Sequence, residues 1–331
     1  MAIYFDHQTN EIESVGSEGT LENFASDIIQ GSDGNTYNLR AGNQGTPAGN
    51  ARGENSVDLQ TARSLADYAA TGGYSAILGG QDNWCAGPHA VISGGQTNSA
   101  SATHGAITGG YSNQISNNYG FIGGGYDSLV DGQYGSVVGG YQNHCNSNYG
   151  VVIGGRESMV HGNAPYGVAH GLNAQANHYG ERAFANGEFF DKGDRQAAET
   201  LLSRSVTHSS TAWFDLYLDG TSTSYLLVVD TAVNGNTAWT FEALIIGATS
   251  GMGKTFSFKI QGCVECDNGA ISILNQTTTT IYDGDDTSFD ARAAVDGTNR
   301  ALLIQVSDSD GASDVVRWVC HLHTVVLRWN S

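Results

Sequence analysis

Short runs of aspartate beside glycine are the residues of this 331-residue chain whose types and spacing come closest to catalytic groups. Paired carboxylates of this kind cleave glycosidic bonds, one as the acid and the other as base or nucleophile. They are Asp283, Asp285 and Asp286, and Asp308 with Asp310. Both runs lie in predicted hairpin turns, where aspartate is the expected residue. We therefore predict that they shape turns, and that the protein has no catalytic residues and is not an enzyme.

Aromatic side chains recur every 15 residues and could contact a ligand. The first column is Tyr74, His89, His104, Tyr119, Tyr134 and Tyr149, and a partial second column is Tyr111, Tyr126 and Tyr141. Stacked rings fill the space between protein chains, and exposed aromatic surfaces also mark binding sites such as those for sugars. We favour packing between chains and keep glycan contact as the alternative.

The two histidines of the first column, His89 and His104, could gather a metal ion if symmetry brought several copies together. A structural role is the favoured interpretation, so we assign no metal site. Trp329, near the end of the sequence, is the candidate receptor contact, because the other tryptophans of the C-terminal region are expected mostly in the core.

The cysteines do not form a recognisable metal or disulfide pattern. Only Cys263 and Cys266 make a CxxC pair, and no second pair follows, as a zinc site would require. The full set is odd in number: Cys85, Cys145, Cys263, Cys266 and Cys320. We predict free, mostly buried thiols and no cofactor.

The charge of the chain excludes two classes of partner. Lys and Arg number 14 and Asp and Glu 33, which gives 14 − 33 = −19. A field of this sign repels nucleic-acid phosphates and anionic lipid head groups. No apolar stretch reaches the roughly 18 residues of a membrane span, and the first residues do not resemble a secretory leader. We expect no nucleic-acid partner and no membrane insertion.

An uninterrupted 15-residue repeat organises residues 74–163. Two of its columns carry apolar side chains and should point inward. They are Ile77, Ile92, Ile107, Ile122, Val137 and Val152, and Cys85, Ala100, Ile115, Val130, Cys145 and Val160. A Gly-Gly pair in each repeat, followed by Asn or Ser, indicates a turn. Each repeat is therefore predicted to form one coil of a parallel β-roll or solenoid, with two short strands and two turns.

A coil this short encloses little core, too little to offset the entropy of ordering it. The missing burial must come from other chains. Additional apolar residues on the first strand of the coil, such as Val91, Phe121, Val138, Val151 and Ile153, offer a second apolar face for a symmetric bundle of rolls.

The repeat pattern Tyr-Gly-x-Val-x-Gly-Gly-Tyr-x-Asn resembles the head repeats of trimeric autotransporter adhesins, and more closely the same repeats in bacteriophage tail fibres. Residues 57–74 and 166–189 are similar to the segments that flank such repeats in phage fibres. The resemblance implies a homotrimer of left-handed rolls in a virion protein, assembled in the host cytoplasm and then extracellular. We favour the phage family because the sequence shows no secretory signal and no membrane-barrel segment.

The region after Gly193 changes to longer segments with period-2 alternation, typical of antiparallel strands. The expected strands are residues 213–218, 224–229, 238–246, 254–260, 270–274, 301–306 and 315–326. Asp-Gly and Asn-Gly pairs between them are typical of hairpin turns. This region is therefore predicted to form an antiparallel β-sandwich, and it also resembles the C-terminal β-domain of phage fibres.

We therefore expect an all-β homotrimer with three parts: a virion-attachment segment (residues 1–56), a β-roll shaft (57–193) and a C-terminal β-sandwich (194–331). The expected function is that of a tail fibre, in which a rigid trimer adsorbs to host-surface polysaccharide or protein and binds other virion proteins through its N-terminal segment. The alternatives are a capsid or baseplate decoration protein that does not adsorb and a polysaccharide-depolymerising tailspike.

Overall fold

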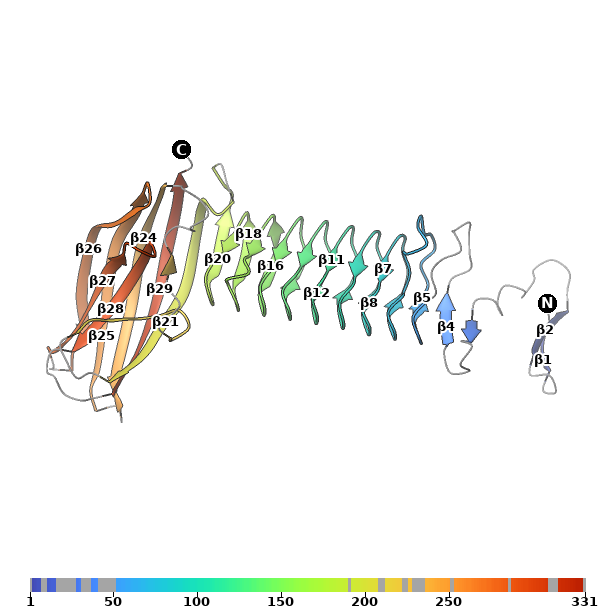
Figure 1. Ribbon diagram of the computed structural model, residues 1–331, viewed down its shortest axis with the longest axis horizontal. Helices are drawn as coiled ribbons and strands as arrows, with labels where there is room; N and C mark the ends of the chain where they lie inside the picture. Colours follow the sequence, from blue (N-terminus) through green and yellow to red (C-terminus); the bar gives the residue numbers. More distant parts are fainter. Residues whose placement is uncertain are drawn as a thin grey trace. The chain divides into compact units, whose positions relative to one another are not determined.

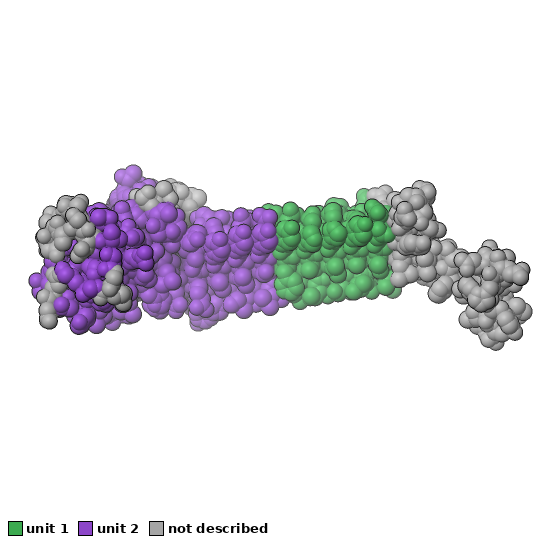
Figure 2. All heavy atoms as spheres, turned by 90° about the horizontal axis from the view of Figure 1, so that it is seen from below, with its two compact units in different colours: residues 1–127 green, residues 128–331 purple. Residues whose placement is uncertain are grey.

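The computed structural model describes residues 2–6, 11–15, 28–30, 37–40, 52–189, 192–207, 212–221, 226–227, 236–250, 253–284, 287–308 and 315–329. It divides into two compact units, residues 1–127 and 128–331, which are coloured separately in Figure 2. The named elements of the described residues are all β-strands, which confirms the all-β class. In this part of the chain no helix has the length and apolar character needed to cross a membrane.

Near the N-terminus, the described residues are four short strands. β1 (Ala2–Asp6) and β2 (Glu11–Val15) form an antiparallel pair, as do β3 (Ile28–Gln30) and β4 (Tyr37–Arg40). β4 then pairs in parallel with β5 (Val57–Asp58), which pairs with the first full coil. Most of the expected attachment segment lies outside the described residues.

The first unit contains the predicted parallel coils (Figure 1). Its first strands pair in parallel and in register at a spacing of 15 residues: β6 (Ala76–Ile77), β8 (Val91–Ile92), β10 (Ala106–Ile107) and β12 (Phe121–Ile122). The second strands do the same: β7 (Trp84–Cys85), β9 (Ser99–Ala100) and β11 (Gln114–Ile115). The parallel β-solenoid expected from the repeat is therefore confirmed.

The same coils continue in the second unit. The first strands are β14 (Ser136–Val137), β16 (Val151–Arg156), β18 (Val168–Leu172) and β20 (Arg182–Asn186). The second strands are β13 (Leu129–Val130), β15 (His144–Cys145), β17 (Met159–Val160) and β19 (Gln175–Ala176). The strict repeat ends near residue 163, but the coil geometry persists to β20. This agrees with the similarity of residues 166–189 to the segments that flank such repeats in phage fibres.

The two apolar columns form the interior of the solenoid. Every residue of both predicted columns is buried, with no more than 1% of its surface exposed. A side chain of one coil therefore lies directly on the same position of the next. This stacking confirms the inward direction predicted for both columns.

A column of asparagines is also buried, although its position was predicted only as a turn. Asn83, Asn98, Asn113 and Asn143 are at most 1% exposed. The side-chain amide of Asn98 donates to the carbonyl oxygens of Gly94 and Gly110 at 3.1 and 3.0 Å. Its own oxygen accepts from the backbone N–H of Asn113, 3.0 Å away in the next coil. These amides satisfy turn carbonyls that burial would otherwise leave unpaired.

The cysteines are free thiols, as predicted, and all are buried except the half-buried Cys263. Burial raises the pKa of Cys85 to about 12 and also raises the pKa values of Cys145 and Cys266, because the thiolate loses its hydration.

We therefore expect only one of the five thiols to react quickly in the native protein. Titration with a disulfide reagent at pH 8 should show one fast thiol, lost in the Cys263→Ser variant, and five thiols after unfolding in guanidinium. Two or more fast thiols in the native protein would show that the coil interiors open readily.

The C-terminal part of the second unit holds two antiparallel sheets. Its five long strands are β21 (Arg195–Thr207), β29 (Val315–Trp329), β24 (Asn236–Thr249), β25 (Thr255–Asp267) and β26 (Ala270–Tyr282), paired in that order. A smaller sheet contains β22 (Phe214–Asp215), β23 (Leu226–Leu227), β27 (Phe289–Asp296) and β28 (Ala301–Asp308). Side chains of both sheets form one buried cluster, in which Phe256 and Phe289 stack at 3.7 Å.

The solenoid and the long-strand sheet are joined by hydrogen bonds within the second unit. β20 pairs in parallel with β18 on one side and antiparallel with β21 on the other. One continuous sheet therefore runs from the last coils to β26, as Figure 1 shows. The predicted turn at Asn268 and Gly269 is present, with φ of 48° and 83°.

Candidate functional site

The aromatic column forms a stacked ladder in the first unit. Tyr74, His89, His104 and Tyr119 follow one another at ring-centroid distances of 5.1, 5.0 and 5.0 Å, with planes 9–14° apart. All four side chains are exposed. Because each ring occupies the same position in its coil, the ladder has the spacing of the coils.

The second unit has a ladder of the same kind. Tyr134, Tyr149 and Tyr166 stack at 5.0 Å with planes 5° apart. Tyr166, which lies beyond the strict repeat, extends the ladder, and Tyr179 ends it with an edge contact at 5.4 Å. Between 42% and 52% of each of the three stacked tyrosines is exposed.

Residues of the partial column also stack, at the other turn of the coil. Tyr111 and Tyr126 stack at 5.2 Å and are 42% and 43% exposed. Tyr141 lies under the guanidinium of Arg156, 5.5 Å from its ring centroid. A cation placed over a ring face is attracted by the ring quadrupole, so Tyr141 and Arg156 of the second unit form a cation–π contact.

The first-column residues all adopt a left-handed backbone conformation. Their φ values lie between 57° and 61° from Tyr74 to Tyr166. This conformation costs roughly 1–2 kcal/mol for a residue other than glycine. It is held in place by the neighbouring coil, as when the N–H of Tyr149 donates to the carbonyl oxygen of Gln133 at 3.0 Å.

This strain predicts an unusual order of stability at Tyr149. Tyr149→Ala should lower the free energy of unfolding by about 1–3 kcal/mol, because two stacked contacts are lost. Tyr149→Gly should be more stable than the alanine variant by about 1 kcal/mol, since glycine adopts this conformation without strain. Guanidinium unfolding of both variants measures the difference.

Ser136, on strand β14 and outside the positive-φ positions, is the matched control. There alanine should be more stable than glycine, as is usual in strands. If alanine is also the more stable residue at position 149, the left-handed conformation does not limit stability there.

The ladder geometry decides how these rings can contact a ligand. Stacking covers the ring faces along each ladder, so a sugar cannot lie flat on an inner ring. The ring edges, the tyrosine hydroxyls and the imidazole nitrogens are the groups that face solvent. The ladders therefore offer a row of hydrogen-bonding groups at a spacing of about 5 Å.

The remaining sequence candidates are not brought together into a site. Trp329 is the last residue of β29, and its side chain lies outside the described residues, as do Asp285, Asp286 and Asp310. His89 and His104 stack on each other. Among the described residues of the single chain, no group of three or more His, Cys, Asp or Glu side chains is placed to hold a metal ion.

The structure adds a polar pair that sequence reasoning missed. His144 Nε2 lies 2.9 Å from Asp131 Oδ2, and both side chains are partly exposed, at 23% and 33%. They belong to adjacent coils on the outer side of the second strands. A carboxylate that holds an imidazole in one orientation is an arrangement suited to proton transfer. The two residues are 13 positions apart in sequence, so their contact can be inferred only when the register of the coils is known.

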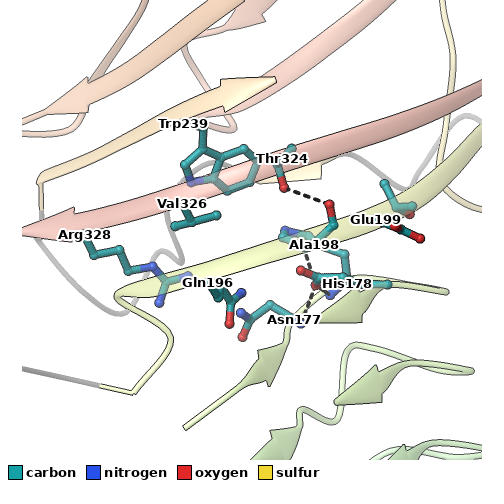
Figure 3. A pocket seen from close by; sticks show the side chains of 11 residues that line it. Asn177, His178, Gln196, Ala198, Glu199, Trp239, Thr324, Val326 and Arg328 are labelled. Atoms are coloured by element: carbon teal, nitrogen blue, oxygen red, sulfur yellow. Dashed lines mark hydrogen bonds and ion pairs between the residues drawn. The ribbon is translucent and has the colours of Figure 1, made fainter. Parts of the chain in front are cut away.

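A buried histidine–carboxylate pair lies where the last coil meets the long-strand sheet (Figure 3). Glu181 accepts hydrogen bonds from the backbone N–H groups of Asn177 and His178 and lies 2.9 Å from His178 Nδ1. Burial acts to raise the pKa of Glu181, but the His178 charge and these donors outweigh it and lower the pKa overall. The adjoining cavity, about 10 Å³ and lined by Trp239 and Thr200, is near the size of one water and too small for a sugar.

Comparison with known proteins identifies no family: no family model and no curated protein matches the chain. Similar solved structures include three phage tailspikes. The tailspike of Acinetobacter baumannii phage AM24 is 9% identical with a TM-score of 0.24, and the match covers 88% of this chain and 60% of that one. The tailspike of Acinetobacter phage vB_ApiP_P1 is 10% identical with a TM-score of 0.19, covering 88% and 74%.

The third similar structure is tailspike protein gp49 of Acinetobacter baumannii bacteriophage Fri1, a capsular polysaccharide depolymerase. It is 7% identical with a TM-score of 0.23, and the match covers 82% of this chain and 62% of that one. The chain thus spans about three fifths of the length of two of these tailspikes. All three belong to the class that the repeat resemblance indicates, phage tail proteins. The expectation that the protein is not an enzyme is contradicted by this comparison, because a depolymerase is among these neighbours, and it is withdrawn.

Proposed function

We propose that this protein is a phage tail protein of the virion that adsorbs to host-surface polysaccharide as a rigid homotrimer. Residues 1–56 attach to other virion proteins, residues 57–193 form the β-roll shaft, and residues 194–331 form a C-terminal β-sandwich that registers the trimer or touches the host. The adhesin-like repeats of the sequence support this assignment. Three copies of each weak site on one particle would bind with an avidity that one site lacks.

The observation that carries the proposal is the exposed aromatic ladder. Tyr111 and Tyr126 present their edges and hydroxyls to solvent at the spacing of the coils, as a repeating ligand such as a polysaccharide requires. Exposed apolar residues on and next to the first strands, such as Phe121 and Leu78, offer a separate surface for contact between chains. The ladders are then free to contact the ligand, in contrast to the packing role favoured from sequence.

An array of bacterial capsular and lipopolysaccharide glycans tests this function. We expect the full chain to bind at least one surface polysaccharide, and the Tyr111→Ala/Tyr126→Ala variant to bind it at least ten times more weakly. Gln96→Ala is the matched control. Gln96 is exposed and occupies the position of Tyr111 in the preceding coil, with which it forms a parallel β-bridge. Unchanged binding by the double variant contradicts the ladder assignment, and no glycan binding at all favours a decoration protein.

Cleavage of the bound polysaccharide is a second candidate function, supported by the Asp131 and His144 pair. The imidazole could take or give a proton at the bound sugar while the carboxylate orients it. New reducing ends released from a bound polysaccharide would demonstrate this activity. Asp131→Asn and His144→Gln should then abolish the release without reducing binding, whereas release that persists in both variants excludes the pair.

A further inference from the structure

The outer face of strands β21, β29 and β24 carries exposed apolar side chains although it lies opposite the buried cluster. Alternate residues of these strands point into that cluster, including Leu202, Leu322 and Ile245. The residues between them point outward and remain exposed by 37–59%: Leu201, Leu244, Ile246, Val315, Val319, Val325 and Leu327. A strand that is apolar on both faces is typical of a sheet covered on both sides.

The strand register gathers these outward residues into one patch. Val319 lies beside Ile246, and His321 lies between Leu201 and Leu244. The patch ends at the next strand, β25, whose outward residues Ser257, Lys259 and Gln261 are polar. A contiguous apolar patch bounded by polar residues marks an interaction surface.

The patch continues onto the last coils along the same hydrogen-bonded sheet. Phe184 of β20 is 46% exposed and pairs with Ala197 of β21, the neighbour of Val325. Leu172 of β18 and Ile153 of β16, 37% and 50% exposed, extend the apolar surface along the solenoid. The outer face of the long-strand sheet is therefore continuous with the apolar face on the first strands of the coils.

Two carboxylates on this face are paired with basic side chains. Glu199 lies between His323 and Arg182, at 3.6 and 4.0 Å, and Glu242 lies 2.8 Å from Lys259. The Lys259 ammonium lowers the pKa of Glu242. A charged ligand would have to break these pairs, whereas another copy of the same face presents matching apolar and paired charged rows. In a cyclic assembly about an axis along the direction in which the strands stack, each strand meets the same strand of the next copies.

We propose that the continuous outer face of β21, β29 and β24 packs against two further copies of this chain and joins the C-terminal parts of the trimer. This inference rests on the proposed homotrimer and names the surface that forms it. The face turns inward toward the other copies, and the polar outer sides of β25 and β26 stay in solvent. The interface then contains the His323 and Glu199 row as its polar centre.

Light scattering of the full chain tests this surface. Leu201→Glu/Val325→Glu places two carboxylates at the most exposed apolar positions, where an isolated chain tolerates them. We expect the wild type to have three times the chain mass and this variant to have a lower mass. Thr277→Glu/Thr279→Glu, on the exposed outer side of β26, is the matched control and should remain trimeric.

The outcomes separate the two proposals. A monomeric wild type overturns the homotrimer and this interface together. A trimeric wild type with a trimeric Leu201→Glu/Val325→Glu variant overturns the interface alone. If that variant does not fold, Val325→Cys in a Cys263→Ser background, treated with a bifunctional maleimide, replaces it. One introduced thiol per chain can link only two chains, so covalent dimers at Val325→Cys but not at Thr279→Cys in the same background support the interface. Their absence from a trimeric protein contradicts it.

Discussion

Replacing Gly95 by alanine should lower the free energy of unfolding by about 3–5 kcal/mol, whereas the same change at the adjacent Gly94 should alter it by less than about 1 kcal/mol. Gly95 has φ of +87°, and a Cβ there would lie 2.2 Å from the carbonyl oxygen of Gly110 in the next coil. A Cβ on Gly94 would meet nothing within 4 Å. The two glycines differ because hydrogen bonds hold the backbones of adjacent coils together, and only Gly95 faces the backbone of the next coil.

Thermal and guanidinium unfolding of the two variants measure this difference. Gly94→Ala is the matched control, because it alters the same Gly-Gly turn by the same atom and reduces only the freedom of the unfolded chain. Equal stabilities of the two variants would mean that Gly95 does not approach the next coil closely. The parallel stacking of the Gly-Gly turns would then be wrong.

The second large effect is expected at Asn113, within the buried asparagine column. Asn113→Ala should destabilise the protein by about 2–4 kcal/mol. Its side-chain amide donates to the carbonyl oxygens of Gly109 and Gly125, both at 3.0 Å, and to Asn98 Oδ1 at 3.1 Å. With alanine at position 113, these three oxygen atoms lose the hydrogen bonds that the Asn113 amide donates, which costs free energy in a buried site.

Gln114→Ala is the control for this experiment, since Gln114 is the next residue, is exposed and should change stability by less than about 0.5 kcal/mol. Asn113→Ser should fall between the two, because Ser128 is buried at the same position of the following repeat. A denaturation midpoint of Asn113→Ala equal to that of Gln114→Ala would contradict a stabilising role for the asparagine column.

The solenoid could be predicted from sequence because its repeat brings like residues into register. One unbroken period of 15 places Ile77 beside Ile92 and Cys85 beside Ala100, and both contacts are present. The asparagine column follows the same period, but its burial could not be predicted, since asparagine after Gly-Gly is also typical of an exposed turn. Only the position of its amide between two coils shows that it is an internal hydrogen-bonding group.

The C-terminal strands were harder to predict than the coils. β21 (Arg195–Thr207) and β27 (Phe289–Asp296) were not expected, because their alanines and charged residues have low strand propensity. β21 becomes a strand through pairing with the preceding strand β20 and with β29, which is distant in sequence. The pair of Asp131 and His144 and the buried pair of His178 and Glu181 likewise depend on the coil register.

The candidate aromatic residues were predicted from their spacing, but the orientation of their rings was not. Stacking at 5.0 Å changes what Tyr149 can do, because its faces are covered by Tyr134 and Tyr166 while its edge remains exposed. Spacing alone does not distinguish stacked rings from rings that lie flat on the surface. That distinction decides which groups a sugar can contact.

The central claim is that narrow coils with an apolar outer face are covered by further copies of the chain. The most direct test is the solution mass of the full-length protein by light scattering, under conditions where the circular dichroism spectrum shows β-structure. We predict a mass three times the 34.8 kDa of one chain, independent of concentration over the measured range. A folded species of 34.8 kDa would contradict the claim and show that a single chain sustains the solenoid.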